Sequence, residues 1–164
     1  MHAHFDWEAS PYFRKLTDTN RLARSLGMTF GNVSGLQGFE DALAQMQESR
    51  GFVCLAESSD GVASLDVSPN ARRVKTVFLA LRHEESDMKA RDRCLALMRE
   101  VFRQFLSHLI REKNRLHVQG IYLDPEIRFH EIEQYFASGC ACAYFQIGIS
   151  TSIDLRYNAG EWTE

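Results

Sequence analysis

The sequence predicts an α+β fold in which a mainly antiparallel sheet carries helices on one face, a two-layer sandwich. Three observations support this prediction. Apolar residues recur every three or four positions over residues 88–115, residues 141–155 alternate between apolar and mostly polar side chains, and shorter apolar runs lie before them. The chain has 164 residues, 45% of them hydrophobic, with no internal repeat and no Pro/Ser-rich linker. We therefore expect a single domain over residues 1–164.

The N-terminal quarter predicts two helices separated by a loop. Ser10 and Pro11 suit the start of a helix and Gly27 suits its end, so the first helix is expected between them. A second, shorter helix is expected over residues 39–46. The intervening residues 28–38 predict a loop because five turn-forming residues fall there: Gly31, Asn32, Ser34, Gly35 and Gly38.

Three strands are expected before the longest helix. Residues 52–56 form a continuous apolar run, which is typical of a strand buried on both faces. Residues 62–67 predict a return strand that ends before Pro69 and Asn70. Residues 74–81 are rich in β-branched and aromatic side chains and predict a central strand.

The helix over residues 88–115 is long and amphipathic. At the usual rise its 28 or so residues span ~42 Å, which is more than the width of a domain of this size. Charged residues occupy the positions outside its apolar stripe. The stripe consists of Cys94, Met98, Val101, Phe102, Phe105, Leu106, Leu109 and Ile110.

The C-terminal quarter predicts one long strand with a single face on the core. Its odd-numbered positions from 141 to 155 hold Ala, Ala, Phe, Ile, Ile, Thr, Ile and Leu. An extended length of ~50 Å exceeds what one small globule can cover. The strand must therefore bend, for example at a bulge at Gly148, or protrude, or pair with another subunit. Residues 127–136 suit either a short helix or a hairpin partner for this strand, and we favour the hairpin.

Charge and composition favour a cytoplasmic protein with reduced cysteines. The chain has 19 Lys and Arg against 22 Asp and Glu. It shows no secretory signal and no apolar run of membrane-spanning length. We therefore expect no membrane partner and no sequence-specific binding of nucleic acid. From Asp124 onward there are seven acids and two arginines. This segment predicts a solvated acidic face or, as the alternative, a docking surface for a basic partner.

Two groups of residues could bind a metal ion or supply an acid and a base. His83, Glu84 and Glu85 collect an imidazole and two carboxylates. They precede the long helix, so the simpler interpretation is a polar helix start with Ser86 or Asp87 as the N-cap. His130 and Glu131 form the second group, which a solvated face also explains.

The cysteines and the basic residues also have two interpretations each. Cys140 and Cys142 could bind zinc with His130, but their spacing is poor for that, and packed thiols are expected, as at Cys54 and Cys94. His2 and His4 could chelate adventitious metal or belong to a loose terminus. Four basic residues could touch phosphate or guard a strand edge against aggregation: Arg72, Arg73, Lys75 and Arg82.

No nucleophile motif and no phosphate-binding glycine loop is present. The glycines at 27, 31, 35 and 38 have neither the dinucleotide-binding nor the P-loop spacing. We therefore predict no catalytic residue, no cofactor and no metal ligand.

Four stretches of the sequence together resemble a family of small structural proteins of phages and prophages. They are residues 12–22, residues 52–57, residues 74–81 before the long helix, and residues 143–158 with Trp162. The family is of the tail-terminator or head-tail completion type. The resemblance implies an α/β protein without catalytic residues that assembles into a homo-oligomeric ring, commonly hexameric. It also implies other tail or neck proteins as partners.

The expected function is accordingly that of a non-enzymatic structural protein of a phage or prophage tail, acting through oligomerisation. Two alternatives remain open. One is a metal-dependent hydrolase that uses His83, Glu84 and Glu85 or His130 and Glu131. The other is a cytosolic adaptor that binds a basic partner through the acidic C-terminal region.

Overall fold

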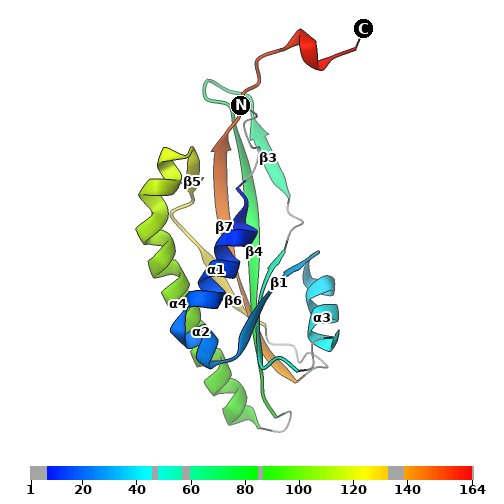
Figure 1. The fold of residues 1–164 in the computed structure, drawn as a ribbon, viewed down its shortest axis with the longest axis vertical. Helices are drawn as coiled ribbons and strands as arrows, with labels where there is room; N and C mark the ends of the chain where they lie inside the picture. Colours follow the sequence, from blue (N-terminus) through cyan, green and yellow to red (C-terminus); the bar gives the residue numbers. More distant parts are fainter. Residues whose placement is uncertain (1–6, 46–47, 57–59, 85–86, 133–138, 164) are drawn as a thin grey trace.

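The computed structural model describes residues 7–163 apart from 46–47, 57–59, 85–86 and 133–138. The molecule is elongated and built on one sheet, with the longest helix lying along it (Figure 1). The α+β class is thus confirmed. The elements are α1 (Ala9–Thr19), α2 (Arg21–Ser25), β1 (Met28–Val33), α3 (Leu36–Gln45), β2 (Gly51–Ala56), β3 (Gly61–Ser64), β4 (Asn70–Arg82), α4 (Met88–Val118), β5 (Ile121–Leu123), β6 (Arg128–Glu131), β7 (Cys140–Ser152) and the 3₁₀-helix η1 (Ala159–Glu161).

The sheet is mainly antiparallel, as predicted. Its strands are ordered β1-β2-β4-β7-β5, with β3 paired to the first part of β4 and β6 paired to β7. β1 and β2 run parallel, and the other strand pairs are antiparallel. β4 and β7 are the long central strands, and their pairing runs without interruption from Asn70 opposite Ser152 to Arg82 opposite Cys140.

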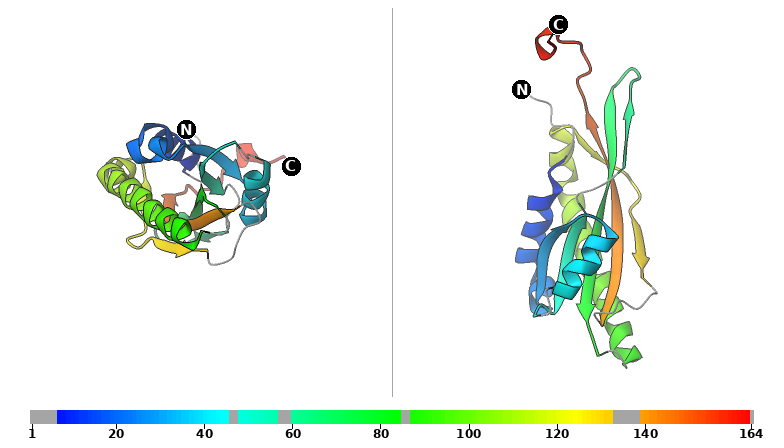
Figure 2. Two further views of the ribbon diagram at one scale, coloured as in Figure 1. Left: turned by 90° about the horizontal axis from the view of Figure 1, so that it is seen from below. Right: turned by 90° about the vertical axis from the view of Figure 1, so that its right-hand side faces the viewer.

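The main core lies between the sheet and the layer formed by α1, α2 and α4. Alternate residues of β4 and β7 point into it, and the apolar stripes of α1 and α4 cover them. Phe13 of α1 lies at its centre, with ring centroids 6.5 Å from Phe105 of α4 and 6.1 Å from Phe145 of β7. Helices therefore cover this face of the sheet along much of its length (Figure 2).

A second core lies on the opposite face beneath α3, which the expectation of helices on one face did not include. Phe39 stacks on Phe78 of β4 with ring centroids 4.6 Å apart. Leu43 and Cys54 are buried beside them. β2 consequently has a helix over each of its faces and is buried at all six positions, as its continuous apolar run predicts.

The N-terminal segment differs from its prediction in two ways. The first helix breaks at Asn20, whose side-chain oxygen accepts a hydrogen bond from the Ala23 amide at 2.8 Å and so starts α2 as a new helix. Gly27 follows the end of α2 with φ at +65°, so the helical segment stops where the sequence predicts. The loop predicted for residues 28–38 is wrong, because Met28–Val33 form β1 and α3 begins at Leu36. Pairing with β2 overrides the turn propensity of those residues.

The middle strands and the long helix follow their predictions with longer or shorter bounds. β3 is shorter than expected and β4 is longer, starting at Asn70. Asp87 is the N-cap of α4, accepting from the Ala90 amide at 3.0 Å. α4 has 31 residues, or ~46 Å at the usual rise. β5 was not predicted: its three residues turn back from the end of α4 to pair with β7.

The hairpin prediction for residues 127–136 is confirmed, since β6 pairs antiparallel with β7; residues 133–138 lie outside the described part of the chain. The long C-terminal strand is confirmed as β7, ending at Ser152. No bulge interrupts it at Gly148, which pairs with Val74 in the continuous register. The end of β7 and the start of β4 therefore extend together beyond the helices (Figures 1 and 2).

Candidate functional site: arm, tail and helical groove

The protruding part of the sheet, here called the arm, comprises residues 61–73 and Ser152 (Figures 1 and 2). β3 and the end of β7 flank the start of β4 there. Three apolar side chains on β3 and the turn after it are largely exposed to solvent. They are Val62, Leu65 and Val67, which are 69%, 78% and 95% exposed. Apolar side chains gathered on an exposed element make it a candidate contact surface.

Residues 153–163 continue from the arm as a segment we call the tail (Figure 1). The Ile153 amide donates to the Pro69 carbonyl at 3.1 Å and ties the start of the tail to the arm. Beyond that point Tyr157 and Trp162 stack on each other with ring centroids 6.3 Å apart. They remain 74% and 65% exposed. Two aromatic rings held together in solvent are unusual for an isolated chain and suit contact with a partner.

The tail is locally ordered by its own polar residues. Asp154 forms an ion pair with Arg156 and also accepts from its backbone amide at 3.0 Å. These hydrogen bonds lower the pKa of Asp154 to about 2, so the carboxylate is charged at neutral pH. Asn158 caps η1 by accepting from the Gly160 amide at 3.1 Å. The tail thus presents aromatic rings and carboxylates together.

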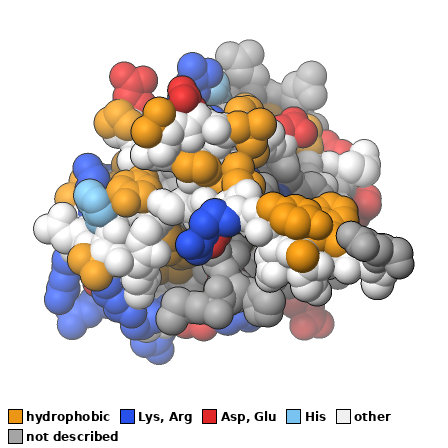
Figure 3. All heavy atoms as spheres, turned by 90° about the horizontal axis from the view of Figure 1, so that it is seen from above, with side chains coloured by type: hydrophobic (Ala, Val, Ile, Leu, Met, Phe, Trp, Pro, Cys, Tyr) orange, Lys and Arg blue, Asp and Glu red, His pale blue; other side chains and the backbone are white. Residues whose placement is uncertain are grey.

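Figure 3 looks down on the arm end of the molecule. Hydrophobic side chains gather on this end, and many of the visible lysine and arginine side chains lie together at one edge of the view. The sequence shows a division of charge between segments. Residues 8–25 and 87–118, which contain α1, α2 and α4, hold twelve Lys or Arg and six Asp or Glu, whereas the rest of the chain holds seven and sixteen. The molecule is therefore basic on its helical layer and acidic elsewhere.

A groove of about 400 Å³ lies on this basic layer, between α4 and the junction of α1 with α2. The buried side chains of Leu16 and Phe105 give it an apolar floor. Arg21 and Arg111 lie at its sides and are exposed. Within the described part of the chain these two arginines form no ion pair, and no carboxylate lines the groove. This groove, called the helical groove below, is suited to an apolar group that carries negative charge.

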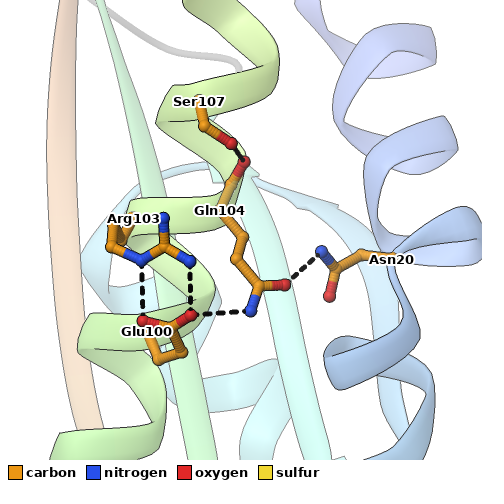
Figure 4. Close-up of polar contacts among 5 residues, drawn as sticks. All are labelled: Asn20, Glu100, Arg103, Gln104 and Ser107. Carbon is orange, nitrogen blue, oxygen red and sulfur yellow. Dashed lines mark hydrogen bonds and ion pairs between the residues drawn. The ribbon is translucent and has the colours of Figure 1, made fainter.

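One wall of the helical groove is fixed by a chain of hydrogen bonds (Figure 4). Asn20 donates from Nδ2 to Gln104 Oε1 at 2.9 Å, and Gln104 donates from Nε2 to Glu100 Oε1 at 2.8 Å. Arg103 donates twice to the same carboxylate, which together with Gln104 lowers the pKa of Glu100 to about 2. The Ser107 hydroxyl donates to the Gln104 carbonyl at 2.8 Å within α4.

Tyr12 and His108 join α1 to α4 near the same groove. The Tyr12 hydroxyl lies 3.0 Å from His108 Nδ1. Burial, with a smaller effect from the charge of Glu112, raises the pKa of Tyr12 far above neutral, so the phenol keeps its proton. The two helices are thus held at a fixed separation by polar contacts at the groove as well as by the core beneath it.

A second cavity, of about 410 Å³, lies on the other face of the sheet near the arm. Arg72 of β4 forms an ion pair with Asp124 over Gly148 of β7. A Cβ atom at Gly148 would lie 1.9 Å from Asp124 Oδ2, so glycine is needed for this close approach. The Asp124 amide also donates to the Gly148 carbonyl at 2.8 Å. The ion pair occupies the base of the cavity and holds β5 against the arm.

The two candidate metal or acid–base groups from the sequence are only partly within the described residues, and their described members make other contacts. His83 contacts the Glu84 carbonyl through Nδ1 at 2.8 Å, while Glu85 lies outside the described residues. His130 stacks on Tyr144 with ring centroids 5.0 Å apart. Glu131 pairs with an arginine of α4. Nowhere in the described part of the chain do three His, Cys, Asp or Glu side chains converge as a metal site would require.

The cysteines are packed, as expected, and all four are free thiols. Cys54, Cys140 and Cys142 are buried in the second core, and Cys94 is half-buried against the main one. Burial raises the pKa of Cys54 to about 12 and that of Cys142 further. The even-numbered face of β7, expected to be mostly polar, is thus buried in its first part because α3 lies over it.

The basic residues near the strand entrances do not form a phosphate site. Arg72 binds Asp124, and Lys75 is buried. Arg82 donates to the Ser49 and Leu43 carbonyls at 2.8 Å each, which anchors the end of α3 to the sheet. His2 and His4, which also were candidates, lie outside the described residues.

The helical groove was not among the sequence-based candidates, whereas the tail lies within the acidic C-terminal region that the sequence offered as a docking surface for a basic partner. The groove depends on the break at Asn20 and on the position of α1 against α4, which no local pattern specifies. The division of charge between the helical segments and the rest of the chain is a property of the sequence itself.

Within the described residues, no helix combines the length and the apolar character needed to cross a bilayer. Comparison with models of known protein families and with curated protein sequences found no match to this chain.

Proposed function

We propose that the chain is a non-enzymatic structural protein that works by assembling with further copies of itself. The observation that carries this proposal is the arm with its tail, where five large apolar side chains are at least 60% exposed. They are Val62, Leu65, Val67, Tyr157 and Trp162. The core beneath is complete without them. Large apolar groups that a fold does not need for its own core serve contact with another surface.

The form of the molecule supports contact between unlike surfaces of neighbouring copies. The arm and tail lie at one end, whereas the basic helical layer lies along the side (Figures 1 and 3). A contact between two different surfaces repeats from copy to copy and closes into a ring when the rotation permits. A ring of this kind agrees with the resemblance to tail-terminator and head-tail completion proteins, and we propose a phage or prophage tail or neck as its setting.

The arm is tested by sedimentation velocity on the double variant Leu65→Ser/Val67→Ser. Both side chains lie on the exposed turn, so the fold should be kept while association weakens at least tenfold. Leu36→Ser is the matched control, because Leu36 is 51% exposed at the start of α3 and lies off the arm. Unchanged association of the double variant would count against the arm as the contact surface.

The hydrolase alternative has no geometric support among the described residues, since neither His83 nor His130 has two further ligands beside it. Metal analysis of the purified protein would revive it if zinc or manganese were bound stoichiometrically. The adaptor alternative predicts a monomer or dimer with salt-sensitive binding to a basic partner. In our proposal the basic surface belongs to another copy of the chain.

A further inference from the structure

We infer that the tail of one copy docks into the helical groove of the next copy, with Trp162 over the apolar floor and the Glu161 carboxylate beside Arg21 and Arg111. This inference rests on the proposed self-assembly and names the two surfaces that form its repeating contact. Two independent observations support it: the exposed, mutually stacked aromatic pair of the tail, and the two groove arginines, which form no ion pair with any described residue.

The tail has the chemistry of a docking segment. Leu155, Tyr157 and Trp162 are all at least half exposed, and none belongs to either core. Asp154 and Glu161 place carboxylates beside these side chains. η1 and the Asn158 cap keep the segment in one conformation, which lowers the entropy lost on binding.

The helical groove has the complementary chemistry. Its floor of Leu16 and Phe105 is apolar, and its sides carry Arg21 and Arg111 with no carboxylate to neutralise them. A volume of about 400 Å³ is within the range of ~300–1,000 Å³ typical of sites that enclose a ligand. That space admits one large aromatic side chain and part of its neighbours. Trp and Arg are also the residues most often found to dominate protein interfaces.

The charge of the wider surfaces favours the same pairing. The helical layer holds twelve basic and six acidic residues, and the rest of the chain holds an excess of nine acidic residues. The tail itself brings Glu161, whose carboxylate can pair with a groove arginine, whereas Asp154 is already paired with Arg156. A pairing of tail with tail or of groove with groove would bring like charges together.

The tail is directed away from the groove of its own copy. It starts at the arm, tied there by the bond from Ile153 to Pro69, and points away from the sheet. α2, at one side of the groove, lies toward the opposite end of the molecule (Figures 1 and 2). The natural occupant of the groove is therefore the tail of a second copy, and the contact is heterologous.

A mixing experiment tests this contact. The tail variant is Trp162→Ala/Glu161→Lys and the groove variant is Arg21→Glu/Arg111→Glu. The tail variant keeps an intact groove, and the groove variant keeps an intact tail. Each variant alone should therefore be monomeric at concentrations where the wild type associates. Its dissociation constant for self-association should be raised at least tenfold. Mixed at equal concentrations they should form one intact contact per pair, and light scattering should find a species of twice the monomer mass that does not grow further.

The matched control is Arg24→Glu/Lys113→Glu, which makes the same change in charge on the same helices at exposed positions outside the groove. It should associate as the wild type does. Circular dichroism and the unfolding midpoint establish that every variant is folded, which is expected because all the altered side chains are exposed.

Three results would overturn the inference. A groove variant that alone forms the wild-type oligomer would show that the contact lies elsewhere. A mixture that stays monomeric, although both variants are folded, would show that tail and groove do not meet. A wild-type protein that is monomeric at every concentration would remove the proposed self-assembly itself, and with it this contact.

Discussion

Replacing Ile149 with lysine tests the assignment of the two faces of β7. The Ile149 side chain is 1% exposed in the main core, directly opposite Arg73 on β4. Loss of its burial costs about 1.5–3 kcal/mol. Desolvation of the new ammonium group adds several kcal/mol more, and the neighbouring arginine increases that cost. The sum is about 5 kcal/mol or more, which is comparable to the whole stability of a typical domain.

The assay is urea unfolding followed by circular dichroism, with Ser150→Lys as the control on the adjacent position. Ser150 lies on the other face of the strand opposite Arg72 and is only half-buried, so its lysine variant should unfold within about 1 kcal/mol of the wild type. Burial lowers the pKa of a lysine, so a folded Ile149→Lys variant should gain stability as pH rises from 7 toward 10. Wild-type stability of Ile149→Lys at pH 7 would refute the assignment of faces.

Three further results are expected. Gly148→Ala should displace the Asp124 carboxylate from above β7 and lower the free energy of unfolding by up to about 1 kcal/mol, measured by urea unfolding, because the ion pair with Arg72 is partly exposed; a loss of several kcal/mol would contradict this. The pKa of Glu100 is lowered from 4.5 to about 2, so its contribution to stability should be present above pH 4.5 and should disappear as pH falls toward 2. The free energy of unfolding of the wild type and of Glu100→Gln, measured against pH, should therefore converge in acid, and parallel curves would contradict this. Alkylation at pH 8 followed by mass spectrometry should modify Cys94 before Cys54, whose pKa is raised to about 12, and faster reaction of Cys54 would argue against the second core.

Periodic hydrophobic patterns predicted the main elements of the fold correctly. The stripe of α4, apart from Ile110, which is 71% exposed, and the odd-numbered residues of β7 point to a single core because each repeats over many turns or residues. The continuous run of β2 indicated burial on two faces, and it is indeed covered on both. These elements determine the main core, which is why the fold class could be predicted.

Predictions failed where a contact distant in sequence decides the local structure. Residues 28–33 are rich in turn formers, yet pairing with β2 makes them a strand. Cys140 and Cys142 were assigned to a mostly polar face, but α3 covers that part of β7 and turns the thiols into core residues. The break at Asn20 also has a local signal, an asparagine in N-cap position, which the surrounding helical pattern obscured.

The candidate site was the hardest part to anticipate. An excess of strand length was visible in the alternation of residues 141–155; it left a bend, a protrusion and pairing with another subunit open, and the continuous register excludes the bulge at Gly148. The groove, in contrast, arises from the packing of α1 and α2 against α4, and its two arginines are 90 positions apart in the chain. Only the three-dimensional arrangement places these two arginines at one groove.

The most direct test of self-assembly is the mass of the wild-type protein in solution, measured by light scattering over a concentration series. The protomer has a mass of 18.8 kDa. We expect the mass to rise with concentration to a plateau at a fixed multiple of that value, as a closed ring requires. A mass equal to that of one protomer throughout the series would contradict the account.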